Sequence, residues 1–300
     1  MMIELEVFFQ FLFSGLTTGC IYAICALGFV LNYNVSNVLN FAQGEYVAYG
    51  GLVAASLVAV GVPMPLAVLA AIAVGTLIGI IQERLTLAPV RSAPGFIIIT
   101  ITLGVSAALR GLAMIIFGKD PLAMRPFTGS EYDTFHLMLA VLPWQTIWVW
   151  GLTILSVGLA FWFLKYTQQG RAVRAVSTNL LAANLMGINA ARISSMVYGA
   201  SAGIGALGGA IIAPIVLANW FSGLDFALKG FMGAIIGNLR NPGRAVLGGL
   251  GVGVLEQFAA GYISSGTRNI VVFGALILFL MVQGGVFARG REDLIAHGGH

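Results

Sequence analysis

Charged residues are scarce in this chain. They make up 9% of its 300 residues, whereas soluble domains carry roughly 25%. Hydrophobic residues make up 59%, and the mean hydropathy is +0.95, a balance that excludes a soluble protein. Because a membrane-spanning helix needs ~20 apolar residues, we expect one all-α, polytopic membrane domain over residues 1–300, with about eight or nine transmembrane helices.

Signatures of catalysis and cofactor binding are also missing. No glycine opens a GxxxxGK[ST] sequence, and no His, Cys and acidic residues recur at metal-site spacing. The two cysteines, Cys20 and Cys25, lie five apart in one apolar run, so they point to different sides of a helix and do not favour a disulfide. The net charge of +4 is too small to indicate nucleic acid. We therefore expect a chain that is not an enzyme and itself binds no metal or cofactor.

The apolar runs predict the order of the helices. They cover residues 7–31, about 47–61, 66–81, 96–117, 145–164, 193–217, 227–239, 245–263 and 270–286. The run 227–239 is short for a full crossing, which favours a tilted or half-inserted helix there. Polytopic proteins of this kind interrupt their helices only where the freed backbone groups are satisfied within the protein or line a wet cavity.

Positive charge near helix ends predicts the orientation, because cytoplasmic loops carry an excess of Lys and Arg. The loop 165–192 contains Lys165, Arg171, Arg174 and Arg192 and no acid, so we expect it in the cytoplasm. The loop 119–143 has mixed charge and is expected outside. Nine crossings then place the N-terminus outside and the C-terminus in the cytoplasm.

Ionisable residues inside the apolar runs are costly and often functional. Arg110 and Glu256 both lie toward the outer ends of their helices, so we consider them a candidate intramembrane ion pair. Such a pair serves helix packing, unless the side chains snorkel to the interface or contact the substrate. Glu45 is the best candidate acid for the alternative of an ion-coupled carrier.

Amide side chains crowd the segment 32–46, which reads NYNVSNVLNFAQGEY. At membrane depth such groups must be hydrogen-bonded within the protein or line a wet cavity. Asn37, Asn40, Gln43 and Glu45 are therefore candidate residues of a translocation path at a broken-helix joint. The alternative is an internal brace that satisfies its own backbone, and the sequence favours neither.

The segment 170–191, GRAVRAVSTNLLAANLMGINAA, is a polar, basic interruption in a mostly apolar chain. It predicts a short helix and then a turn at Gly187, inside the expected cytoplasmic loop. A structured helix in such a loop indicates a partner that docks there. Since the chain has no ATP-binding sequence, the energy source is expected on another chain.

Several motifs in order resemble one known family. These are GLTTGCIYAICALGFVLNYNVSNVLNFAQGEY near the start, the Gln82–Glu83–Arg84 sequence with Pro89 and Arg91, the segment 170–209, and the glycines around 247–253 followed by Glu256. The chain is similar to the H-type permease subunits of branched-chain amino acid importers driven by ATP-binding cassettes. The resemblance runs nearly end to end.

The resemblance implies a set of partners. These are a second, M-type permease in a heterodimer, two cytoplasmic ATPase subunits that carry the ATP and Mg, and a periplasmic binding protein, all at a bacterial inner membrane. It also implies that the segment 177–187 is a coupling helix that sits in a cleft of the ATPase. The coupling residues it points to are Ser177, Asn179, Leu181, Ala183, Leu185, Met186, Gly187 and Asn189.

Departures from the family pattern bear on the substrate. Gln43 stands where a histidine is common, and positive charge replaces glycines in the loop 237–244. The coupling segment lacks acids near Ser177, so we expect docking by shape and apolar contact. We expect a permease for branched-chain or other hydrophobic amino acids or a related small solute. The alternatives are an importer of urea, short amides or aromatic acids, and an ion-coupled secondary transporter.

Overall fold

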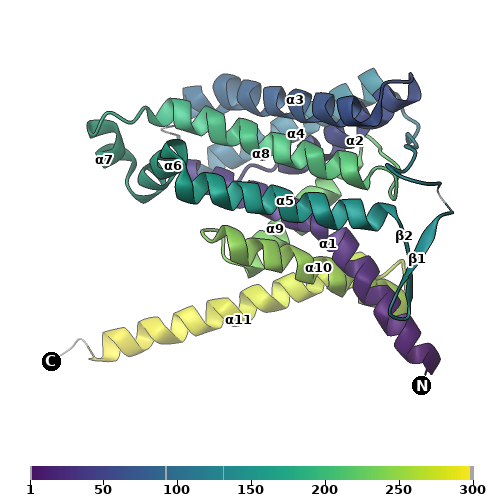
Figure 1. Cartoon of the computed structure of the whole chain (residues 1–300). Coiled ribbons are helices and arrows are strands. Elements are labelled where there is room, and N and C mark those ends of the chain that lie inside the picture. Colours follow the sequence, from purple (N-terminus) through teal and green to yellow (C-terminus); the bar gives the residue numbers. More distant parts are fainter. Residues whose placement is uncertain (1, 92, 131, 298–300) are drawn as a thin grey trace.

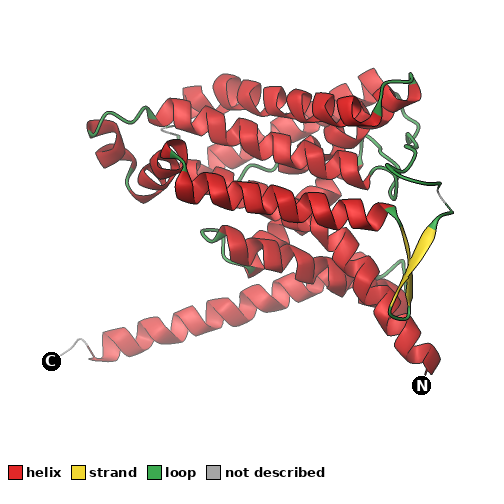
Figure 2. Cartoon of the chain, viewed as in Figure 1, coloured by secondary structure: helices red, strands yellow, loops and turns green. Residues whose placement is uncertain are grey.

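The computed structural model describes the backbone of residues 2–91, 93–130 and 132–297, and within these ranges the side chains from residue 4 to residue 282. The chain is mostly helical (Figure 2). The long helices are α1 (Met2–Ser36), α2 (Gln43–Ala59), α3 (Met64–Gln82), α4 (Gly95–Phe117), α5 (Gln145–Tyr166), α8 (Ala190–Ile212), α9 (Ser222–Ile236), α10 (Pro242–Tyr262) and α11 (Arg268–His297). Between them lie η1 (Glu83–Leu87), η2 (Ala88–Val90), α6 (Gln168–Thr178) and α7 (Leu180–Leu185).

Six helices in the described residues are long and apolar enough to cross a membrane, namely α1, α3 with its continuation to Val90, α4, α5, α8 and α10. The chain is thus an all-α polytopic membrane protein, as expected. Helix α2 has 17 residues and α9 has 15, fewer than the ~20 that a perpendicular crossing requires. The count of eight or nine crossings, and the half-inserted helix, remain predictions.

Helix α1 lies at the centre and packs closely against α10 (Figure 1). Glycines make the approach possible, since lipid provides little hydrophobic drive and close backbone contact must hold such helices together. A Cβ atom added at Gly253 would collide with the backbone of Gly19. On the same helix, a Cβ atom at Gly251 would meet open space.

We therefore expect Gly253→Val to destabilise the protein, because it forces α1 and α10 apart. Overpacking of this kind costs about 1–3 kcal/mol. The thermal unfolding midpoint of the purified permease should fall, while Gly251→Val on the same helix should leave it close to the wild-type value. Equal midpoints for the two variants would show that this contact does not hold the helices together.

A β-hairpin corrects the all-α expectation for the loop 119–143. Strands β1 (Thr134–Leu137) and β2 (Ala140–Pro143) pair antiparallel around the two residues Met138 and Leu139. The sequence does not predict this turn. Two-residue hairpin turns usually carry Asn-Gly or Asp-Gly, which adopt a positive φ easily, whereas here Met138 adopts a φ of 53°. The Gln10 side chain of α1 donates to the Val141 carbonyl at 2.9 Å and accepts from its N–H at 2.8 Å.

The two ends of the helix bundle differ in character. Helices α6 and α7 lie at one end, and the hairpin lies at the other, beside the start of α1 (Figure 1). The loop 165–192 is thus not an open loop but two short helices in sequence. The N-terminal helix begins on the hairpin side, and the far end of α11 lies on the α7 side.

Candidate functional site

The short helix α7 is fixed at both ends by its own sequence. The Asn179 side chain caps the start by accepting a hydrogen bond from the Ala182 N–H at 3.0 Å. At the other end Gly187 takes a φ of 83°, and its N–H bonds the Asn184 carbonyl, while the Ile188 N–H bonds the Ala183 carbonyl. This pair of bonds is a Schellman motif, which glycine favours because it adopts the left-handed conformation without strain.

The outer surface of α7 is apolar and exposed. Leu185 and Met186 are 81% and 82% exposed, and Leu181 is 72% exposed. Ala183 is buried and packs in a cluster with Val176. The α7 tip, defined as Leu180, Leu181, Leu185 and Met186, is thus an apolar surface presented on a structured support, the kind of surface that marks an interaction site.

The other predicted coupling residues have local roles in the fold. Asn189 caps α8 by accepting from the Arg192 N–H at 3.0 Å. The Ser177 hydroxyl donates to the Arg174 carbonyl at 2.9 Å. The structure thus divides the predicted set into exposed apolar side chains, a buried anchor, capping residues, and Ser177, which bonds within α6. A role for any of them in docking remains a prediction.

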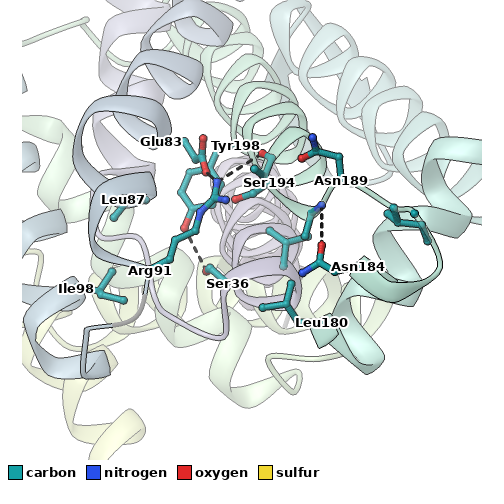
Figure 3. A pocket seen from close by; sticks show the side chains of 15 residues that line it. Ser36, Glu83, Leu87, Arg91, Ile98, Leu180, Asn184, Asn189, Ser194 and Tyr198 are labelled. Carbon is teal, nitrogen blue, oxygen red and sulfur yellow. Dashed lines mark hydrogen bonds and ion pairs between the residues drawn. The ribbon is translucent and has the colours of Figure 1, made fainter. Parts of the chain in front are cut away.

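A cavity of about 530 Å³ lies beneath α7, between the end of α1, the π-helical turn η1 and the start of α8 (Figure 3). Glu83 is fully buried in its wall. It accepts hydrogen bonds from the Arg91 guanidinium and from the Ser195 hydroxyl. The bond from Ser195 ties η1 to the first turns of α8, which follow shortly after α7 in the chain.

The amide-rich segment forms a hydrogen-bonded network around the start of α2. Gln43 accepts from Asn32 at 3.1 Å and from the Ser201 hydroxyl at 2.8 Å. Asn40 accepts from Gln82 at 2.9 Å, and it donates to the Tyr46 hydroxyl at 3.1 Å. Buried polar groups are costly unless paired in this way. These hydrogen bonds link α1, α2, α3 and α8.

The four candidate path residues differ in burial. Asn40, Gln43 and Glu45 are buried, but Asn37 is exposed and adopts a φ of 53° in the break between α1 and α2. For Asn40 and Gln43 the geometry agrees with the interpretation as a brace. Their place on a translocation path remains a prediction.

The predicted pair of Arg110 and Glu256 is wrong. Arg110 lies 2.8 Å from the Glu45 carboxylate, which also accepts from the Ser106 hydroxyl at 2.8 Å. Glu256 instead pairs with Lys229 at 2.6 Å. Similar depth in the membrane did not imply contact, because α4 packs on α2, whereas α10 packs on α1 and α9.

Lys229 is the charged residue that the sequence reasoning missed. Its side chain is 1% exposed, and it contacts Asp225 at 2.8 Å as well as Glu256. The Tyr22 hydroxyl donates to the other oxygen of Glu256 at 2.5 Å. The signal was a lone lysine inside the short apolar run 227–239, since a charge there needs a buried partner.

A polytopic helical protein with paired charges inside it and an apolar tip on one loop has the features of a membrane transport permease. The family model described as "Branched-chain amino acid transport system / permease component" matches residues 11–282. The chain therefore belongs to that family, and it is a permease subunit of the importer class driven by ATP-binding cassettes. Its class is thus that of a transport subunit.

Similar proteins agree with this assignment. The chain is 28% identical to the "High-affinity branched-chain amino acid transport system permease protein LivH" of Escherichia coli K12, over 96% of this chain and 98% of the relative. It is 27% identical to the protein BraD of the same description from Pseudomonas aeruginosa, over 97% and 99%. It is also 28% identical to the "Ribose import permease protein RbsC" of E. coli K12, over 87% and 78%.

Proposed function

We propose that this permease imports branched-chain or other hydrophobic amino acids, or a related small solute, which a periplasmic binding protein delivers. The names of the relatives LivH and BraD support this solute class. The similarity to a ribose permease shows that related chains serve other solutes. Urea, short amides and aromatic acids are the alternative cargoes that the departures from the family pattern leave open.

The proposed assembly contains a second, M-type permease and two cytoplasmic ATPase subunits that hold ATP and Mg. It lies in an inner membrane, with the N-terminus outside and the C-terminus in the cytoplasm. Two features support this orientation. The basic loop 165–192 is expected inside, and the end of α11 lies on the same side of the bundle as α7 (Figure 1).

The observation that carries the proposal is the exposed α7 tip. Three of its side chains, Leu181, Leu185 and Met186, are more than two-thirds exposed on a helix that is capped at both ends. Burying one such side chain in a partner's cleft contributes about 1.5–3 kcal/mol. Together they favour docking of α7 without a salt bridge, although part of this gain offsets the entropic cost of association.

The direct test is co-purification. The tagged permease, expressed with the neighbouring genes of its operon, should elute with an ATPase. Because the docking is mainly apolar, the complex should persist in about 1 M NaCl, where the Debye length is ~3 Å. Dissociation by salt would contradict an apolar contact. Uptake that proceeds without any ATPase and follows a proton gradient would favour the ion-coupled carrier instead.

A further inference from the structure

The cavity beneath α7 is not accounted for by docking of the α7 tip. Leu181, Leu185 and Met186 of the tip are exposed and do not line the cavity, whereas Leu180 lines it together with residues of α1, η1 and α8. Its volume of about 530 Å³ falls in the ~300–1,000 Å³ range typical of pockets for small ligands. A space of this size and composition suits a small molecule.

One side of the cavity offers a cation with unused donors. Within the described residues, the hydrogen bonds of Arg91 all use Nη2, toward Glu83 and toward the Ala191 carbonyl at 3.5 Å. A guanidinium has five N–H donors in a fixed fork. The remaining edge suits the two oxygens of a carboxylate, which Arg binds in bidentate fashion. Arg91 is 39% exposed and is therefore reachable.

Beyond Arg91 the wall has a polar part, formed by Ser36, Glu83, Asn184, Asn189, Ser194 and Tyr198, and an aliphatic part. Val35, Leu87, Ile98 and Leu180 line the cavity. In Figure 3 Arg91 reaches into the space beside Leu87, with Leu180 across from it. A ligand with a carboxylate at one end and a short branched hydrocarbon at the other would satisfy both parts of the wall.

We propose that this cavity binds a short aliphatic carboxylate, with its carboxylate on Arg91 and its hydrocarbon against the aliphatic wall. An amino acid that the importer has released and the 2-oxo acid made from it share this chemistry. Because Leu180, Asn184 and Gly187 also line the cavity, an occupied cavity supports α7 from behind and resists its inward displacement. The solute class rests on the proposed function, whereas binding itself requires no ATPase contact.

The test measures protection of a cysteine at the cavity. Ala191 is exposed and lines the cavity, so Ala191→Cys reports on access in a background where Cys20 and Cys25 are replaced by alanine. The full chain, in nanodiscs with its partner subunits and without nucleotide, is labelled with N-ethylmaleimide. L-leucine or 4-methyl-2-oxopentanoate at about ten times its dissociation constant should slow labelling roughly tenfold. Leucinol, which lacks the carboxylate, should not.

Arg91→Gln should remove the protection, and Arg84→Gln should not, because Arg84 is exposed in η1 but does not line the cavity. Protection by only one of the two acids shows whether the ligand is the amino acid or its 2-oxo acid, and it supports the proposed binding site. Absence of protection by both, or equal protection by leucinol, overturns the proposal even if Arg91→Gln fails to fold. If no ATPase docks but the ligands still protect the cysteine, the proposed function is refuted and the binding site is not.

Discussion

Met186→Asp is expected to lower substrate-stimulated ATP hydrolysis by about a hundredfold, the equivalent of about 2.7 kcal/mol. The Met186 side chain is 82% exposed, so the substitution costs the isolated permease little. In the docked assembly, however, the new carboxylate would be buried in an apolar cleft without a partner, and such burial is expensive. The measurement is ATP hydrolysis by the reconstituted importer, with and without the loaded binding protein.

Met186→Leu is the matched control, because it keeps an apolar side chain of similar volume at the same place. It should retain most of the stimulation. The thermal unfolding midpoints of both variants should equal that of the wild type, which separates docking from folding. Full stimulation in the aspartate variant would show that the α7 tip does not enter the ATPase.

Lys229→Met is expected to destabilise the fold by about 3–5 kcal/mol, the usual cost of removing one partner of a buried ion pair. Glu256, only 3% exposed, would keep its charge without the close lysine. Arg268 lies 3.6 Å from Oε1 of Glu256, the oxygen that Lys229 also contacts. Because Arg268 is half exposed, it replaces the ion pair with Lys229 poorly. The yield of monodisperse protein and its thermal unfolding midpoint report the loss.

The double variant Lys229→Met with Glu256→Gln should recover most of that loss, because it removes both buried charges together. Asp225→Asn should have a small effect, since the Asp225 side chain is 42% exposed and its pairing is screened by water. A single Lys229→Met variant as stable as the wild type would show that the pair does not hold α9 against α10.

Composition and charge pattern were sufficient to predict the membrane class, most helices and the position of α7. These features depend on the local sequence, such as the Asn179 cap and Gly187. The ion pairs were not predictable, because the partner of Arg110 depends on which helices touch. Nor was the hairpin, whose turn at Met138 lacks the usual residues. The buried contact of Glu83 could not be predicted either, because it depends on the fold placing Ser195 beside it.

Helix α1 has a consequence for how distant parts of the molecule move together. It has 35 residues, a length of about 52 Å at 1.5 Å per residue. Near its start Gln10 holds the hairpin, and at its end Ser36 lines the cavity beneath α7. One unbroken rod thus joins the two faces of the protein. A tilt imposed at the hairpin would therefore reach the wall of that cavity through a single helix, together with the helices that pack on it.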